Sequence, residues 1–419
     1  MRGVTGVVEP NSREHSEVST SPKSHAFRAK IQLGAIYGSM LVAGWNDGTS
    51  GPLIPKMQEV YHVQFLLVSV IFVLASVGYI SGALINMRWT NSVSFGKILI
   101  FGALCQAAAY AIQAPAPPFP LFVISFALSG IGIAIQNAQA NAYVASLEHN
   151  SEIYMGMLHA RYGAGALTSP LIATQFSQTR HWSFHYLVSL GLAISNVVIL
   201  TLTFRFRTLD ESLARIGEAV PETNSSDRSN FRQILSIKTV HVLAFFILVY
   251  VGVEVTIGGW ITTYIIDVRG GGASAGYISS GFFGGIMVGR LALLWLNRKI
   301  GEYRALFLYI ALAIGLELVV WFVPSLIGGA VAVALTGVFL GPMYPIVMNH
   351  AGRVVPRRLL AGSVGWIAGL GQVGSAILPF ITGAIASKTG IRALQPLLVS
   401  LMCLFPVLWG LVPLSRRID

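Results

Sequence analysis

Long runs of apolar residues, each bounded by charged residues, proline or glycine clusters, follow one another along almost the whole chain. An α-helix needs about 20 such residues to span a bilayer. The pattern predicts twelve membrane spans, six on either side of a polar gap. The predicted spans are 31–49, 65–86, 96–114, 119–146, 155–177 and 183–204 in the first half, and 238–266, 273–296, 304–323, 326–350, 360–384 and 391–413 in the second.

The polar segments predict the domain organisation. Residues 205–237 are mixed in charge and poor in aromatics, which is typical of a solvated linker between two six-helix bundles, 31–204 and 238–413. Residues 1–30 are expected to be a disordered tail and residues 414–419 a short one. The stretches "GALTSP" from Gly165 and "GSAILP" from Gly374 occupy equivalent places in the two halves, which favours an internal repeat.

Composition supports a membrane protein. Of the 419 residues 54% are hydrophobic and only 11% are charged, too little polar material to cover a soluble globule. The two cysteines, Cys105 and Cys403, lie in apolar segments and give no disulfide framework, and no cofactor or metal is expected. No catalytic or nucleotide-binding motif is present, so the sequence predicts neither an enzyme nor an ATP-driven pump.

The distribution of lysine and arginine predicts the orientation. The chain has a net charge of +11, and most of its basic residues fall at the termini, in the central gap and in the even-numbered connections. Basic residues are retained on the cytoplasmic side, so both termini and the linker are expected in the cytoplasm. This asymmetry accounts for the positive charge without a nucleic-acid partner. The plasma membrane is the expected location.

Several motifs resemble those of the major facilitator superfamily, and within it the fucose-permease-like group with its fungal-type members. The motifs are "LIPKMQEVY", "AQANAYV", "HARYGAGALTSPL", "VGVEVTIGGWITTY", "GRLALLWLNRKIG" and "MYPIVMNHAG". The resemblance implies an all-α fold of two six-helix bundles related by a pseudo-two-fold axis. It also implies a monomer whose central cavity is lined by the first, fourth, seventh and tenth spans.

Two carboxylates are candidates for proton coupling. A charge at mid-bilayer costs at least about 2.5 kcal/mol, so each should face protein or water. Asp47 lies in the first span, and two roles stay open for it: a proton site in the cavity, or a structural acid bonded to backbone amides near "GTSGP". Glu254 lies in the seventh span with Trp260 about two turns along, and a carboxylate with an aromatic plane suits a polyhydroxy ligand. A structural pairing of Glu254 is the alternative.

Amides and aromatics in the remaining cavity-facing spans are candidate substrate-binding residues. Such amides bind hydroxylated solutes, but they also hold membrane helices together. The candidates are Asn46, Gln136, Asn137, Asn141, Trp260, Tyr344, Asn349, Trp366 and Gln372. Matched to bacterial fucose permeases, the coupling acid of the fourth span corresponds to Asn137 here, so proton coupling rests on Asp47 or Glu254 or is absent.

The gating motif expected after the second span is degraded to "GALINMRWTNSVSFGK". Gly82, Gly96 and Lys97 remain of it, whereas Asn86 occupies the region of an expected acid. Arg290, in "GRLALLWLNRKIG", is assigned to the gate of the second half by the same resemblance. We therefore expect Gly82, Lys97 and Arg290 to contribute to gating.

The expected function is secondary active transport of a small organic solute across the lipid bilayer by alternating access. A sugar or polyol moving in symport with a proton, driven by the proton gradient, is the favoured substrate. Efflux of an amphipathic metabolite is the main alternative. A facilitator without proton coupling, a channel and a ligand-sensing transceptor are further alternatives.

Overall fold

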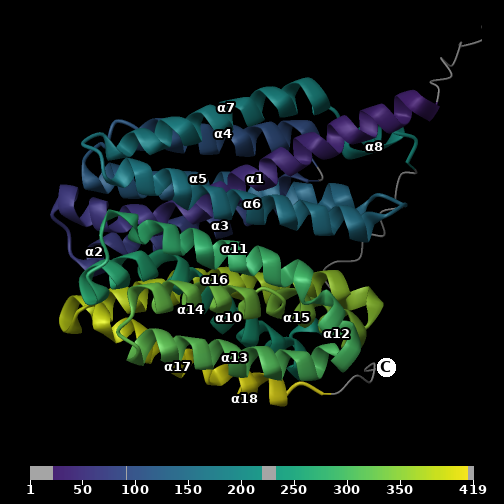
Figure 1. The fold of residues 1–419 in the computed structure, drawn as a ribbon. Coiled ribbons are helices and arrows are strands. Elements are labelled where there is room, and N and C mark those ends of the chain that lie inside the picture. Colours follow the sequence, from purple (N-terminus) through teal and green to yellow (C-terminus); the bar gives the residue numbers. More distant parts are fainter. Residues whose placement is uncertain (1–21, 91, 219–232, 414–419) are drawn as a thin grey trace, which may run out of the picture.

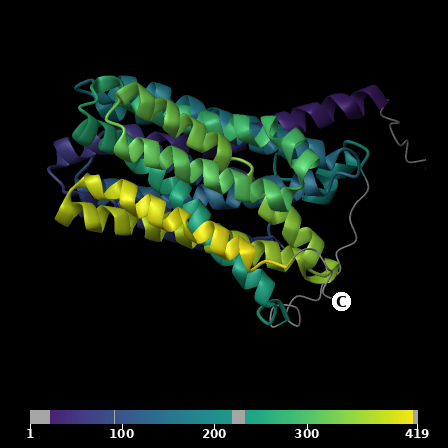
Figure 2. The ribbon, with the colours of Figure 1, turned by 60° about the horizontal axis from the view of Figure 1, so that its bottom comes forward.

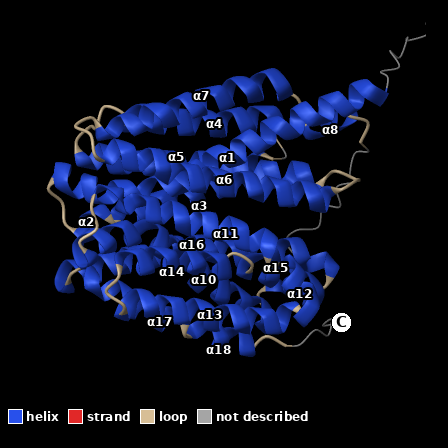
Figure 3. Ribbon diagram, viewed as in Figure 1, coloured by secondary structure: helices blue, strands red, loops and turns tan. Residues whose placement is uncertain are grey.

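The structure is a computed structural model that describes residues 22–90, 92–218 and 233–413. Throughout these ranges the regular structure is helical and no strand occurs (Figure 3). Residues 22–30, which we expected to belong to a disordered tail, instead form the first turns of a 40-residue helix. The rest of that expected tail, the middle of the linker and the short C-terminal tail lie outside the described residues.

The helices fall into two sets that follow each other in the chain. The first set is α1 (Pro22–Tyr61), α2 (Phe65–Val68), α3 (Val70–Trp89), α4 (Phe95–Gln113), α5 (Phe119–Ala145), α6 (Ser151–Ser177), η1 (Trp182–Phe184), α7 (His185–Phe204) and α8 (Leu209–Ala214). The second set is α10 (Lys238–Arg269), η2 (Ala273–Gly276), α11 (Tyr277–Ala292), α12 (Leu294–Ile300), α13 (Glu302–Phe322), α14 (Leu326–Leu340), α15 (Met343–Val354), α16 (Arg357–Thr389), η3 (Ile391–Ala393), α17 (Leu394–Met402) and α18 (Leu404–Gly410).

Most of these helices are suited to a bilayer by composition alone. Within the described residues, nine helical segments are long and apolar enough to span a membrane, and α11 with α12, bent by 49° at their junction, makes a tenth. Helices α1 and α6 carry more polar and charged residues, yet they run through the bundle beside the others (Figure 1). Counting these two gives the twelve crossings predicted from the sequence.

The two sets form two layers of roughly parallel helices (Figure 1). Helices α1 and α3–α7 make one half, α10–α18 make the other, and the turned view shows the same elongated bundle from another side (Figure 2). Between the halves, α6 packs on α11 and α16 packs on α3. A functional site between α1, α6, α10 and α11 would therefore involve both halves.

Equivalent helix pairs hold each half together. Helix α1 packs mainly on α6, and α10 packs mainly on α16. The two small-residue stretches lie at these contacts: a Cβ at Gly165 would lie 2.1 Å from the Leu41 carbonyl oxygen, and one at Gly374 would lie 2.0 Å from that of Leu248. Both glycines therefore allow the same close backbone approach, at positions that correspond between the halves. The internal repeat of the sequence therefore appears in the structure as two equivalent helix contacts.

We expect Gly165→Ala and Gly374→Ala each to destabilise the protein, because the added methyl cannot fit against a neighbouring backbone. Overpacking of this kind costs about 1–3 kcal/mol. Thermal unfolding in detergent should show a lower midpoint for both variants. The matched controls are Gly156→Ala in α6 and Gly369→Ala in α16, where a Cβ meets nothing within 4 Å. Equal midpoints for all four variants would contradict the assignment of these two contacts.

Candidate functional site: a cavity between the two halves

A cavity of about 1250 Å³ lies between the two halves. Its walls come from α1, α3, α5 and α6 on one side and from α10, α11, α15 and α16 on the other. It extends from Asp47 and Glu254, near the middle of α1 and α10, to the beginning of α6 and to α12. The cavity therefore leads from the centre of the bundle to the end where α6 begins, which we call the open end.

The halves meet closely at the opposite end, which we call the closed end. Here α1 touches α10, because a Cβ at Gly51 would lie 2.1 Å from the Gly258 carbonyl oxygen. The backbone amide of Leu66 donates to Ser387 Oγ at 2.7 Å, and Gln178 Nε2 donates to the Ala273 carbonyl at 3.2 Å. Contacts between backbones and short polar groups leave little space, so this end is sealed.

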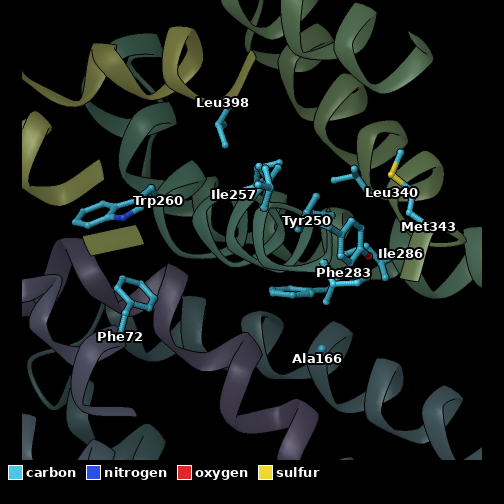
Figure 4. Close-up of a cluster of buried hydrophobic side chains, with 14 of the residues drawn as sticks. Phe72, Ala166, Tyr250, Ile257, Trp260, Phe283, Ile286, Leu340, Met343 and Leu398 are labelled. Carbon is cyan, nitrogen blue, oxygen red and sulfur yellow. The ribbon is translucent and has the colours of Figure 1, made fainter. Parts of the chain in front are cut away.

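Aromatic packing adds to the seal. Phe72 of α3 points across the interface toward Trp260 of α10 (Figure 4), with ring centroids 6.2 Å apart. Phe65 approaches the same indole at 5.9 Å, and Trp260 Nε1 donates to the Pro379 carbonyl at 3.0 Å. The sequence-based assignment of Trp260 to the substrate site is corrected here: its side chain is fully buried in the seal and does not line the cavity.

Asp47 projects into the cavity from α1. The Tyr162 hydroxyl of α6 donates to its Oδ2 at 2.5 Å, and Asn46 Nδ2 donates to Oδ1 at 3.3 Å. Asn46 in turn accepts from the Tyr110 hydroxyl at 3.2 Å. Helix α1 continues unbroken through this region in spite of Pro52 and Pro55, so the carboxylate is bonded by side chains and not by amides of a broken helix.

Glu254 and Arg290 reach the cavity from the other half. Glu254 of α10 and Arg290 of α11 both line it, and no described residue forms an ion pair within 4.0 Å of either. Arg290 Nε donates to the Gly341 carbonyl at 3.3 Å and interacts electrostatically with Glu254 and with Tyr162. Arg290 thus acts on Glu254 of its own half and on Tyr162, the residue of the other half that bonds Asp47.

The amides of α5 divide between two roles. Asn137 lines the cavity and its Nδ2 donates to the Tyr79 hydroxyl at 3.0 Å. Asn141 does not line the cavity; its Nδ2 donates to Asn137 Oδ1 at 2.8 Å and so fixes the orientation of that amide. Gln136 is buried in the first half, where it accepts from Gln106 Nε2 of α4 at 2.7 Å. Gln136 and Asn141 are therefore corrected to packing and positioning residues.

The second half contributes Tyr344, Asn349 and Gln372 to the lining, as the sequence suggested. Asn349 lies at the open end, where its Nδ2 donates to Glu302 Oε1 at 3.1 Å. Trp366 does not line the cavity and contacts the ring of His241 edge-on, so its assignment is corrected.

Of the three expected gating residues, Arg290 alone lies in the cavity. Gly82 packs against the Ile131 backbone of α5 within its own half. Lys97 is exposed at the start of α4. Asn86, which occupies the place of an expected acid, accepts from Gln139 Nε2 at 2.6 Å, again within the first half. Gly82 and Lys97 therefore lie outside the cavity, and their expected contribution to gating stays a prediction.

Sequence reasoning missed the tyrosines. Tyr79 and Tyr162 line the cavity and bond Asn137 and Asp47, respectively. Each is a hydroxyl in an apolar span, the same signal that singled out the amides. Pairing them with their partners needs helix neighbours that are far apart in the chain.

A separate cluster has the composition of a metal site. Glu148, His149 and Glu218 place ligand atoms within 4.8 Å of one another at the surface. The Glu148 backbone amide donates to Glu218 Oε2 at 2.8 Å, so a local contact already accounts for one carboxylate. The cluster lies outside the cavity.

The family follows from a sequence comparison. Residues 36–379 match the model of the Major Facilitator Superfamily. The chain belongs to this family. It is accordingly a multi-pass membrane transporter and not an enzyme.

Curated relatives cover nearly the whole chain. Bypass of stop codon protein 6 of Saccharomyces cerevisiae is 26% identical over 98% of this chain and 88% of its own length. A glucose/galactose transporter of Brucella abortus is 24% identical over 92% of this chain and 93% of its own. The glucose/mannose transporter of Bacillus subtilis is 22% identical over 83% and 86%, respectively.

Solved structures share the fold. A bacterial homologue of the human lysosomal transporter Spinster, in an inward-facing and unoccupied conformation, aligns with a TM-score of 0.74 over 92% of this chain and 97% of that one, at 13% identity. A D-xylose-proton symporter aligns with a TM-score of 0.73 over 93% and 98%, at 12% identity. The Escherichia coli fucose:proton symporter aligns with a TM-score of 0.63 over 94% and 100%, at 16% identity.

Proposed function

We propose that this transporter carries a sugar or a similar polyol in symport with a proton. The observation that carries the proposal is the polar lining of the cavity at its centre. Carboxylates, amides and hydroxyls from both halves converge there, and each can bond a solute hydroxyl. The central polar residues are Asn46, Asp47, Tyr79, Asn137, Tyr162, Glu254, Tyr344 and Gln372.

The named substrates of the relatives support the same class. The Brucella and Bacillus relatives are named for glucose with galactose or mannose, and two of the structural neighbours are proton symporters of fucose and xylose. The apolar part of the lining, which includes Phe72, Phe126 and Phe283, suits the apolar face of a sugar ring. It would equally suit an amphipathic metabolite, so efflux of such a compound is the alternative outcome of the test below.

Alternating access follows from the two ends of the cavity in this proposal. With both termini in the cytoplasm, as the distribution of basic residues predicts, the open end faces the cytoplasm and the conformation is inward-open. Closure of that end and opening of the seal at Gly51 and Gly258 would expose the same side chains to the other face of the membrane. We propose the plasma membrane as the location and a monomer as the working unit.

Asp47 is the proposed proton carrier, with Glu254 as its electrostatic partner. Asp47 is open to the cavity and bonded by two side chains that come from α6 and from its own helix. A motion of α6 relative to α1 would alter the Tyr162 bond, and with it the relative stability of the charged and protonated carboxyl. Glu254 acts electrostatically on Asp47 from the half that moves against it, and Arg290 acts on Glu254 and on Tyr162.

Purified protein in liposomes should exchange labelled sugar for unlabelled sugar inside the vesicle. Asn137→Ala should raise the concentration for half-maximal exchange by about 2- to 10-fold, because one hydrogen bond to the solute is lost. The control is Asn86→Ala, an amide of the same half that does not line the cavity.

Exchange measured with a panel of monosaccharides, polyols and amphipathic metabolites identifies the class of substrate. Exchange of amphipathic compounds alone would replace the proposed substrate by the efflux alternative.

Asp47→Asn should abolish uphill uptake driven by a proton gradient while exchange at equal pH persists, because the amide cannot carry a proton. Uphill uptake and exchange are measured on the same liposomes. The matched control is Glu317→Gln, which removes a carboxylate buried in α13, outside the cavity. Undiminished uphill uptake by the Asp47 variant would exclude this residue as the coupling site.

A further inference from the structure

A second pocket, of about 170 Å³, lies at the end of the first half, outside the transport cavity. This volume is several times the roughly 30 Å³ occupied by one water molecule. The pocket is formed where α1 begins, where α7 ends and where the chain passes into α8. We call it the arginine pocket; it is lined by Arg28, Ile31, Gln32, Leu202, Thr203, Arg205, Arg207 and Arg215.

Four arginines converge on this small space. None of the described residues that line it is acidic, and no arginine of the pocket forms an ion pair with a described residue. Burial and the neighbouring Arg215, Arg205 and Arg28 lower the pKa of Arg207, which shows that like charges act on one another here. Such a concentration of positive charge is expected to bind an anion.

The acid that acts on Arg207 is already used by the fold. Glu211 of α8 interacts with Arg207, but its Oε2 accepts from the Thr208 backbone amide at 2.9 Å. Its own backbone amide donates to Thr208 Oγ1 at 3.2 Å, which completes a capping box at the start of α8. The carboxylate thus stabilises the helix start and does not occupy the pocket.

The backbone around the arginines is fixed. Arg205 adopts a positive φ of 53°, and the Gly96 amide donates to the Arg207 carbonyl at 2.9 Å. A Cβ at Gly96 would lie 2.4 Å from the Arg205 carbonyl oxygen, so a glycine is required there. This contact explains Gly96 of the degraded motif: it holds the arginine-bearing turn against α4.

A buried amide closes the other side of the pocket. Gln32 Nε2 of α1 donates to the Ser212 carbonyl of α8 at 3.1 Å, and its Oε1 accepts from the Tyr143 hydroxyl at 2.6 Å. Helix α8 is therefore tied to α1 and α5, and the position of Arg215 follows from this connection. The arginine pocket is built into the fold.

The surroundings of the pocket are apolar and exposed. Leu202 and Phe206 are 72% and 62% exposed, and Phe27 and Ile31 on α1 are 65% and 44% exposed. Helix α7, a membrane span, continues away from the pocket with Val198 and Ile199 exposed on its surface. A ligand in the pocket therefore sits at the boundary between the hydrocarbon region and water.

We propose that the arginine pocket binds the phosphate group of an anionic membrane lipid. Guanidinium groups bind phosphate oxygens through paired hydrogen bonds, and basic pockets at the membrane surface bind anionic head groups. The acyl chains would lie along the exposed leucine, valine and isoleucine side chains of α7. Retention of basic residues on the cytoplasmic side accounts for arginines near this surface but does not require them to share one pocket.

The test uses the full-length protein in nanodiscs. Discs of phosphatidylcholine with phosphatidylglycerol are compared with discs of phosphatidylcholine alone. Thermal unfolding is measured, and native mass spectrometry counts the phosphatidylglycerol that the protein retains after release. Inorganic phosphate added to the phosphatidylcholine discs forms the second arm. We expect stabilisation and retained lipid in the phosphatidylglycerol discs; the same stabilisation by inorganic phosphate would assign the pocket to free phosphate.

The variants separate the pocket from surface charge in general. Arg207→Gln with Arg215→Gln should weaken retention of phosphatidylglycerol about tenfold, because paired hydrogen bonds to phosphate are lost. Arg207→Lys with Arg215→Lys keeps the charge and should give an intermediate loss. The control, Arg88→Gln, removes an exposed arginine from the last turn of α3, outside the pocket.

Equal retention by the wild type and the glutamine variant would overturn the proposal, as would an equal loss in the Arg88 control. If the double glutamine variant does not fold, each single glutamine variant is tested in the same way, by the number of phosphatidylglycerol molecules that it retains. Size-exclusion chromatography shows whether each single variant is folded. None of these substitutions touches the transport cavity, so failure here leaves the proposed function standing.

Discussion

The contact of α1 with α10 at Gly51 and Gly258 is the constraint on which the rest of the structure depends. Two backbones touch there without side chains between them, so the halves of the protein are held together at one end. Helices packed at one end enclose a cavity at the other, and among the described residues the lining of the cavity leads to that other end. Trp260, with Phe65 and Phe72 against it, fills the remaining space of the seal.

The cavity also explains where charge is tolerated in this chain. A carboxylate facing lipid would be costly, whereas one facing a water-filled space between two bundles keeps part of its hydration. Asp47, Glu254 and Arg290 all meet this condition. Because the two carboxylates lie on opposite halves, their separation changes when the halves move. In the proposed function, this change couples substrate binding and proton binding to the movement of the halves through one set of side chains.

Much of this was accessible from the sequence. The apolar runs predicted the number of membrane crossings. The family resemblance predicted the fold and four of the helices that line the cavity, α1, α5, α10 and α15, whereas α3, α6, α11 and α16 line it as well. Charged and amide side chains in apolar spans identified Asp47, Glu254 and Asn137, since such groups need a polar environment. The corresponding positions of Gly165 and Gly374 in the sequence predicted an equivalence that the structure has: both glycines allow a close approach to the backbone of a neighbouring helix.

The failures have a common cause. Spacing along a helix gives the face of a residue relative to its neighbours, but it does not give the rotation of that helix in the bundle. Gln136 and Trp260 were placed in the cavity on spacing and type, whereas tertiary packing turns Gln136 toward α4 and Trp260 into the seal. Tyr162 was missed because its partner, Asp47, is 115 residues away in the chain.

The most direct test of the account is a pair of distances, one across each end of the cavity, measured between spin labels in lipid. Labels on Leu66→Cys and Ser387→Cys report the distance across the closed end, and labels on Ile153→Cys and Arg298→Cys report the distance across the open end. Both pairs carry Cys403→Ser, which removes an exposed cysteine that would also be labelled. Gly51→Val should force the seal apart, with Gly34→Val, where a Cβ meets nothing within 4 Å, as the control. Alternating closure predicts that Gly51→Val gives a longer distance at the closed end and a shorter one at the open end. An increase at both ends, or no change at either, would contradict alternating closure around this cavity.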